Sequence, residues 1–397
     1  MMSRQSTQRD RVSALWIACA LCVAASACRQ PVLPRGQAQA EADGPVTIAA
    51  PWPWESRTTL LYGQGIQMAV DEINAAGGVL GRPLTVLRED DHESVDRGRL
   101  VAQRLAGNDD VVAVIGHMQS YVSLPAAAIY DLSGLVHVAP TATDPRLTEQ
   151  GYRRLFRMTF TDRETGAQMA DFAAARGYDR VAIYYIRNAY GRGLANAFEE
   201  RALERGVGIA DRQSYDPNTV AGDRALTDIV ASWRDLDLSA IFIAGEPRQA
   251  AAMIRSARES GIAVPVLGGD ALGTSSFVGL GGRFAEGAVV AAAFHPGDRR
   301  EEVQRFSAAF RQRYGALPDA SAALGYDAVR LLVHGITRAG GVDPDAVAEA
   351  LRTTTGWRGV TGAFAFTDDG DLVERTIGKV VVRDGQFAWL GDAAGGD

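Results

Sequence analysis

The sequence predicts an α/β protein built from two doubly wound lobes. Short β-rich runs alternate with helical stretches, this alternation restarts midway along the chain, and the chain is long for a single core. It has 397 residues, of which 47% are hydrophobic, and chains of more than about 250–300 residues usually divide into domains. The strand-like runs are almost continuously apolar, as expected for parallel strands covered by helices on both faces.

The first half of the chain alternates strands and helices from residue 46 onward. We expect strands over 46–50, 84–89, 111–115 and 135–139, and helices over 61–76, 95–106 and 121–131. Gly77 and Gly78 follow the first helix, which is a typical position for a helix stop. The first lobe is predicted to comprise residues 45–161, completed by a later segment over 295–357.

The pattern then restarts and forms a second unit of similar size. We expect strands over 181–186, from 207, and over 240–244, 264–268 and 288–293, with helices over 167–175, 194–204, 225–233 and 249–259. Three further helices and three β-rich runs follow, over 301–313, 322–339, 344–351, 363–366, 379–383 and 386–390. The second lobe is predicted to comprise 162–294 and 358–397. Ligands bind at the carboxyl ends of strands in such sheets, so the cleft between the lobes is the expected site.

The N-terminus has the features of an export signal. Arg4, Arg9 and Arg11 precede an apolar run over 12–27 that ends in Ala25-Ser26-Ala27-Cys28. This ending resembles the lipobox of bacterial lipoproteins, which implies removal of residues 1–27, lipidation of Cys28 and a periplasmic location. Membrane contact is then expected only through the lipid anchor. Ordinary signal cleavage and a short membrane anchor are the alternatives. Residues 28–44 have the composition of a flexible tether.

Several functional classes are disfavoured by composition and motifs. Net charge is −7 with both signs mixed along the chain, so no nucleic acid partner is expected. All three cysteines precede residue 29, which leaves the mature body without a disulfide or a thiol nucleophile. Nucleophile-elbow, zinc-helix, Walker A and dinucleotide fingerprints do not occur in the mature chain, and its five histidines lack ligand spacing. The sequence therefore predicts no enzyme, no cofactor and no metal site.

Two loops at predicted strand ends have the chemistry of an anion site. One covers 114–120 and the other 139–145, and each runs into a helical segment. Ser120 and Thr143 are placed to cap those segments, with free backbone N–H groups beside their hydroxyls. Both loops should face one cleft and could donate to one carboxylate. The alternative is that both residues are ordinary caps without a ligand.

Longer motifs show a resemblance to a known family. Ala69-Val70-Asp71-Glu72-Ile73-Asn74-Ala75-Ala76-Gly77-Gly78, Tyr190-Gly191-Arg192-Gly193-Leu194-Ala195 and Gly325-Tyr326-Asp327-Ala328 resemble segments of the leucine/isoleucine/valine-binding protein family, and the resemblance spans most of 46–390. It implies a type I periplasmic binding protein fold, with two Rossmann-like lobes joined by a multi-stranded hinge. Such proteins close around a ligand and present it to ABC transporter permease subunits. A monomer is expected.

The resemblance also assigns the main-chain groups of an amino-acid ligand. Ser120 and Thr143 match the residues that hold the α-carboxylate, and the backbone of Thr141 and Ala142 would accept from the ammonium. Asp270, after a Gly-Gly step on the second lobe, would pair with the same ammonium. The alternative for Asp270 is a loop aspartate that faces water.

Other positions bear on the ligand side chain. Tyr62 and Tyr190 match pocket tyrosines, and Glu246 lies near a position where the family has another tyrosine. Trp52 and Trp54 stand between prolines after the first strand, where they would either stack on a ligand or cation at the cleft mouth or pack beneath the loop.

These residues predict the solute-binding component of an amino-acid ABC importer. The second hypothesis is a sensory binding protein of the same fold for an amide, a urea-like compound or an aromatic acid.

Overall fold

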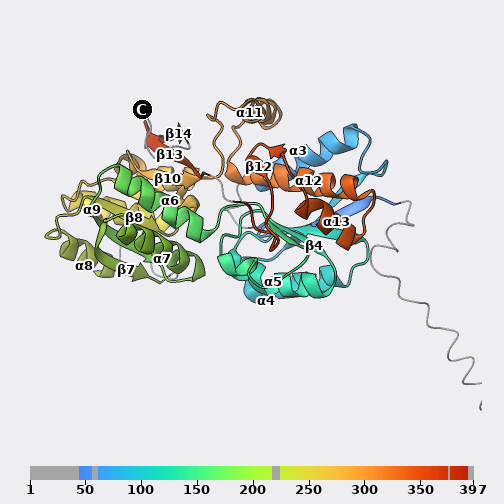
Figure 1. Cartoon of the computed structure of the whole chain (residues 1–397). Helices are drawn as coiled ribbons and strands as arrows, with labels where there is room; N and C mark the ends of the chain where they lie inside the picture. The colour runs from blue at the N-terminus through green and yellow to red at the C-terminus, as the bar shows by residue number, and fades with distance from the viewer. Residues whose placement is uncertain (1–43, 56–60, 217–223, 374–375, 392–397) are drawn as a thin grey trace, which may run out of the picture.

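The computed structural model describes residues 44–55, 61–216, 224–373 and 376–391. These residues form two α/β lobes that lie side by side (Figure 1). The predicted signal peptide, nearly all of the tether and Cys28 lie outside the described residues. No helix in the described ranges is both long enough and apolar enough to span a membrane.

The first lobe is built on a sheet of five parallel strands in the order β2-β1-β3-β4-β5. The strands are β1 (Val46–Trp52), β2 (Leu84–Asp90), β3 (Val111–Ile115), β4 (Val136–Ala139) and β5 (Leu155–Arg157). One face is covered by α4 (Val95–Ala106) and α5 (Ser120–Leu132), and the other by α3 (Tyr62–Ala75), α11 (Glu301–Tyr314), α12 (Ala320–Ala339) and α13 (Pro344–Arg352). This two-sided cover confirms the doubly wound prediction.

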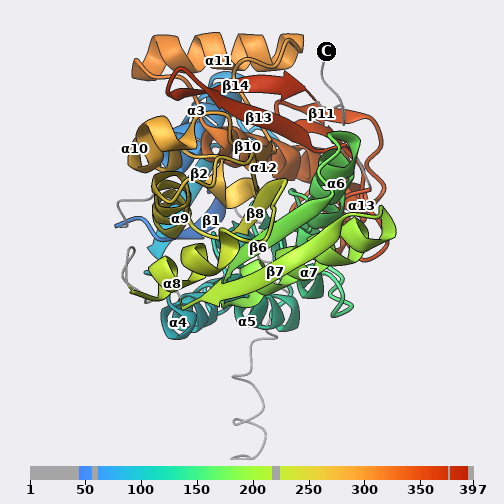
Figure 2. The same ribbon diagram turned by 90° about the vertical axis from the view of Figure 1, so that its left-hand side faces the viewer.

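The second lobe is built on a sheet of seven strands in the order β14-β13-β10-β9-β8-β6-β7. Its strands are β6 (Arg180–Ile186), β7 (Gly208–Tyr215), β8 (Ala240–Ala244), β9 (Val266–Gly268), β10 (Val289–Ala292), β13 (Gly378–Arg383) and β14 (Gln386–Gly391). The last two are antiparallel additions, which Figure 2 shows at one edge of the sheet. One apolar cluster involves α6 (Asp162–Ala175) and α7 (Ala189–Glu204), and the other α8 (Arg224–Trp233), α9 (Pro247–Glu259) and α10 (Ser275–Gly281).

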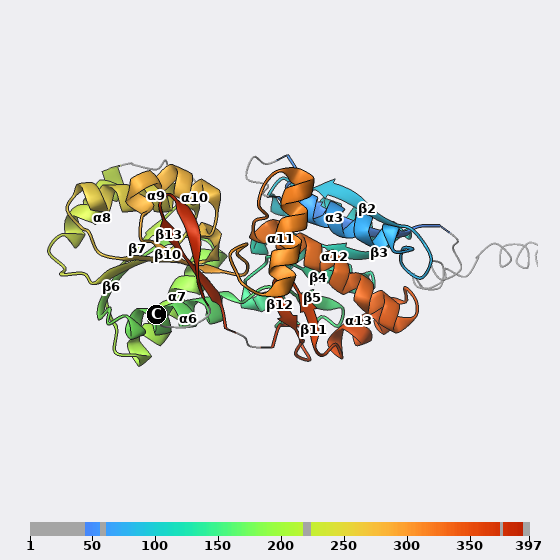
Figure 3. The same ribbon diagram turned by 90° about the horizontal axis from the view of Figure 1, so that it is seen from above.

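Three segments cross between the lobes, as the multi-stranded hinge requires. They connect β5 to α6, β10 to α11, and the hairpin of β11 (Trp357–Gly359) and β12 (Gly362–Phe364) to β13. Seen from above, the first two crossings lie in the narrow region between the two bodies (Figure 3).

The last crossing comes later in the chain than the expected lobe change at residue 358. Val360, Phe366 and Leu372 are buried in the same apolar cluster as the first sheet. The buried Asp327 carboxylate on α12 also accepts hydrogen bonds from the backbone of Val360 and from the backbone and hydroxyl of Thr361. The β11–β12 hairpin therefore belongs to the first lobe, and the chain leaves that lobe after Leu372.

Candidate ligand cleft

The candidate residues lie at the carboxyl ends of parallel strands in both lobes. In the first sheet, Ser120 follows β3 and the loop over 141–144 follows β4. In the second sheet, Tyr190 follows β6, Glu246 follows β8 and Asp270 follows β9. The strand order reverses beside β1 in one sheet and beside β6 in the other, and such switch points open a crevice for ligands.

Ser120 and Thr143 contact each other rather than capping helices, which corrects the sequence-based expectation. The N-cap of α5 is Gln119, and Ser120 is its first helical residue. The Ser120 hydroxyl oxygen accepts from the backbone N–H groups of Thr143, at 3.1 Å, and Asp144, at 3.3 Å. Asp144, not Thr143, caps the short helix η1 (Pro145–Leu147). Because its oxygen already accepts two bonds, the Ser120 hydroxyl can direct its hydrogen toward a ligand.

Backbone donors accompany this hydroxyl at the start of α5. The N–H groups of Ser120 and Tyr121 precede the first intrahelical bonds, and no hydrogen bond from either is found among the described residues. Free first-turn amides, together with the positive end of the helix dipole, favour a carboxylate at this position. The Thr141 hydroxyl donates to the Met118 carbonyl at 2.9 Å, which ties the two loops together.

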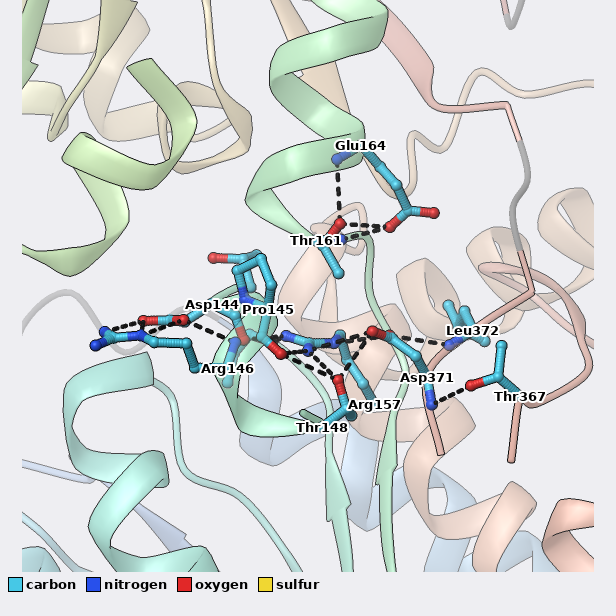
Figure 4. A network of polar contacts seen from close by, with 12 residues as sticks. Asp144, Pro145, Arg146, Thr148, Arg157, Thr161, Glu164, Thr367, Asp371 and Leu372 are labelled. Atoms are coloured by element: carbon cyan, nitrogen blue, oxygen red, sulfur yellow. Dashed lines mark hydrogen bonds and ion pairs between the residues drawn. The ribbon is translucent and has the colours of Figure 1, made fainter. Parts of the chain in front are cut away.

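Arg157 holds the loop that carries Thr141 to Asp144. Its side chain is completely buried at the end of β5. Nη1 donates to the carbonyls of Ala142 (2.9 Å) and Asp144 (2.8 Å), Nη2 donates to the Thr148 hydroxyl (2.8 Å), and Nε donates to the Asp371 carboxylate (2.8 Å). Figure 4 shows this network reaching from the loop to the segment that precedes the third crossing. The Ala142 carbonyl, assigned to a ligand ammonium from the resemblance, thus already accepts from Arg157.

The aromatic residues near β1 form an internal stack. Pro51 and Trp52 continue β1 beyond its expected end, and they pair with the last residues of β2. Trp52 is 1% exposed and stacks on the buried Tyr62 with ring centroids 3.7 Å apart. The Trp54 indole donates to the Ala50 carbonyl, and the Arg88 guanidinium lies over its ring. The structure thus favours packing beneath the loop over a wall at the cleft mouth, and Tyr62 lies in the core with its hydroxyl donating to Ile115.

The second lobe contributes a tyrosine and an aspartate that contact each other. The Tyr190 hydroxyl donates to the Asp270 carboxylate at 3.2 Å and accepts from the Ala271 amide at 3.4 Å. Gly269 permits this approach, because a Cβ there would lie 2.6 Å from the Tyr190 hydroxyl. Burial raises the pKa of Asp270, while hydrogen bonds from the Asp270 backbone and Tyr190 lower it. This loop aspartate is therefore held beside Tyr190 within the protein.

Glu246 brings a further carboxylate to the same region. It is the N-cap residue of α9, yet its side chain accepts no capping bond from that helix. Its backbone N–H donates to the Tyr215 hydroxyl at 2.8 Å, which fixes the backbone. Burial, together with the negative charges of Asp270 and Glu93, raises the pKa of Glu246 to about 7. Since Glu93 belongs to the first lobe, this influence acts across the cleft.

Sequence reasoning missed three contributors. Tyr121, beside Ser120, has its pKa raised to about 12 by burial and by the charges of Glu93 and Glu246, so it lies near the same carboxylates. Arg157 gave no signal beyond an arginine at the end of an apolar run. Asp162, the first residue of α6, is 1% exposed, and neither carboxylate oxygen has a hydrogen-bond partner in the described chain.

Comparisons with known proteins agree with this architecture. A model of the periplasmic binding protein family matches residues 46–386. A leucine-, isoleucine-, valine-, threonine- and alanine-binding protein of Pseudomonas aeruginosa is 29% identical over 314 residues, which are 78% of this chain and 81% of that protein. The structure of an ABC transporter substrate-binding protein from Desulfitobacterium hafniense in complex with Leu is 36% identical, with a TM-score of 0.79 over 87% of this chain and 99% of that one. A branched-chain amino acid transporter substrate binding protein from Streptococcus pneumoniae in complex with isoleucine is 26% identical, with a TM-score of 0.79 over 86% of this chain and 97% of that one.

Proposed function

Because the chain belongs to the periplasmic binding protein family, we propose that it captures an amino acid between its lobes and delivers it to the permease subunits of an ABC importer. Membership implies an extracytoplasmic location. Relatives that bind leucine or isoleucine, at 36% and 26% identity, support an amino-acid ligand. The observation that carries the proposal is the pairing of opposite chemistries at facing strand ends: hydroxyl and amide donors on the first lobe, and carboxylates on the second.

The ligand main chain spans these two sets of groups. Its carboxylate accepts from the Ser120 hydroxyl and from the amides of Ser120 and Tyr121. Its ammonium donates to Asp270, which Tyr190 orients. The ligand ammonium gains the Asp270 carboxylate only when the second lobe approaches, and the ligand carboxylate gains its donors only from the first lobe. The ligand therefore stabilises the closed arrangement more than the open one, which biases the hinge toward closure.

We propose further that the protein binds without catalysis. The hydrogen bonds of the His117 ring go to Asp91 and Tyr130, and that of His137 goes to the Gly116 carbonyl. His295 contacts the Phe387 carbonyl and accepts from the Gly297 amide. Thus no histidine in the described ranges is hydrogen-bonded to a serine or threonine hydroxyl in the manner of a nucleophile and its base. Incubation of the purified protein with each bound amino acid should leave the ligand chemically unchanged.

A thermal-shift panel of amino acids, amides and small carboxylates tests the ligand class. Ligand present at about a hundred times its dissociation constant should add about 2.7 kcal/mol to the free energy of unfolding. At least one amino acid should raise the melting temperature. Simple amines and simple carboxylates should not displace it from the protein. Stabilisation by simple carboxylates or amides but by no amino acid would contradict the proposal.

A further inference from the structure

Three carboxylates of the candidate site have no cationic partner among the described residues. Asp162, Glu246 and Asp270 form no ion pair with an arginine or lysine in the part of the chain that the structure describes. All three lie around one phenol, because the charges of Asp270, Asp162 and Glu246 each raise the pKa of Tyr190, after burial as the largest cause. Asp162 is buried, whereas Glu246 and Asp270 are half-buried. Carboxylates removed from water without a counter-charge destabilise the protein unless they are protonated or paired.

Asp162 shows that this space is prepared for a partner. Both of its oxygens lie buried without a hydrogen bond among the described residues, and Thr143 approaches the carboxylate without reaching hydrogen-bond geometry. A buried polar group left unbonded costs about 1–3 kcal/mol. Burial raises the pKa of Asp162 well above its usual range, and the Asp270 charge acts in the same direction. The environment of Asp162 therefore disfavours its charged form.

The remaining charges do not balance with a neutral amino acid. An α-amino acid brings one carboxylate, which the first-lobe donors accommodate, and one ammonium, which Asp270 accommodates. Glu246 is left over. Its side chain accepts no bond from α9, its backbone is held by Tyr215, and Glu93 adds a further negative charge from the opposite lobe.

We propose that the ligand carries a second positive charge on its side chain and that Glu246 binds it. The ligand class is a basic amino acid, with an ammonium or guanidinium at the end of an aliphatic chain. This inference rests on the proposed function and adds a specificity for the side chain. The cation would lie between Glu246 on the second lobe and Glu93 on the first, so both lobes gain from closure over it.

Pairs of ligands of equal shape test the inference on the wild-type protein. Isothermal titration calorimetry compares L-lysine with L-norleucine, L-ornithine with L-norvaline, and L-arginine with L-citrulline, each pair differing in the side-chain charge. At least one cationic member should bind about ten- to a hundredfold more tightly than its neutral partner, the range expected for a hydrogen bond to a charged group. No variant is needed for this comparison, so it does not depend on a mutant that folds.

Glu246→Gln then assigns the effect to this residue. The variant should lose most of the preference within each pair while retaining its affinity for the neutral member. Glu349→Gln on the exposed face of α13 removes the same charge far from the candidate residues and should preserve the preference. Neutral members that bind as tightly as the cationic ones, or a preference that survives in Glu246→Gln, would overturn the inference and leave the proposed function standing. Binding of no amino acid at all would overturn both.

Discussion

Replacing Arg157 by methionine tests whether this buried side chain positions the ligand loop. Methionine fills a similar volume but supplies none of the four donated bonds to Ala142, Asp144, Thr148 and Asp371 that are shorter than 3 Å. The two backbone carbonyls and the Thr148 hydroxyl would then lose the guanidinium as a donor, and the Asp371 carboxylate would keep only its bonds from Thr148 and Leu372. Since the guanidinium is fully buried, water replaces these bonds poorly.

The expected cost follows from the environment of each partner. Removing one member of a buried ion pair costs about 3–5 kcal/mol, but the Asp371 side chain retains 23% exposure, which places its share at the low end. Each carbonyl left unsatisfied costs about 1–3 kcal/mol, and the contributions overlap because all share one guanidinium. We expect a loss of about 3–5 kcal/mol from a total of about 5–15. The variant should fold at low temperature with reduced stability.

Urea unfolding followed by circular dichroism measures this loss, and calorimetry on the folded variant measures binding. Affinity for the best ligand should fall more than tenfold, because the loop over residues 141–144 loses the hydrogen bonds that hold it in place. Arg163→Met is the control, since its ion pair with Glu149 is exposed on both sides and should change stability by less than about 0.5 kcal/mol. If Arg157→Met keeps wild-type affinity once folded, Arg157 does not position the loop.

Four further changes test other parts of the site. Asp270→Asn should weaken every amino acid by about ten- to a hundredfold in calorimetry without altering the circular dichroism spectrum; unchanged affinity would refute its pairing with the ammonium. Ser120→Ala should weaken binding and also lower stability by about 1–3 kcal/mol, because two buried amides lose their acceptor; a loss of stability alone would leave Ser120 a structural residue. Because the pKa of Glu246 is raised to about 7, cationic ligands should bind more tightly as pH rises from about 6 to about 8, where deprotonation supplies the charge, and Glu246→Gln should flatten this profile. The same raised pKa makes the ligand-free protein lose stability as pH rises from the unfolded value of 4.5 toward 7, so ligand-induced stabilisation should increase over that window. Cys28→Ser should move the protein from the detergent phase to the aqueous phase in a partition assay, since the thiol is the proposed site of lipid attachment; partition that does not change would exclude the anchor.

Hydrophobic patterning was sufficient to predict most elements, and its errors have a common physical cause. The expected strand over 240–244 coincides with β8, which is buried on both faces and pairs on both sides. At the edge of the same sheet, β7 continues to Tyr215 through Asp211, Arg212 and Gln213. Only one side of an edge strand pairs, so polar residues are tolerated there and the apolar signal ends early.

The sequence predicted which residues lie in the candidate site, but it did not predict the hydrogen bonds that they form. Capping motifs describe bonds within a few residues, whereas the acceptor for the Thr143 amide is a hydroxyl 23 positions earlier in the chain. The Arg157 network likewise joins groups up to 214 positions apart. Such bonds depend on which strands are neighbours, and local spacing carries no information about strand order.

Strand order also decides the charge balance of the cleft. In the sequence, Tyr190, Glu246 and Asp270 lie in three separate segments, and each acidic residue has an arginine within a few dozen positions that could have neutralised it. Placing β8 between β6 and β9 brings the three segments to one edge. Arg187, three residues before Tyr190, instead pairs with Asp216. Resemblance to a family can identify the residues that bind a ligand's main chain, because all amino-acid ligands share the same main-chain groups. The unpaired Glu246 concerns the ligand's side chain, and its significance depends on a three-dimensional arrangement that leaves it without a counter-charge.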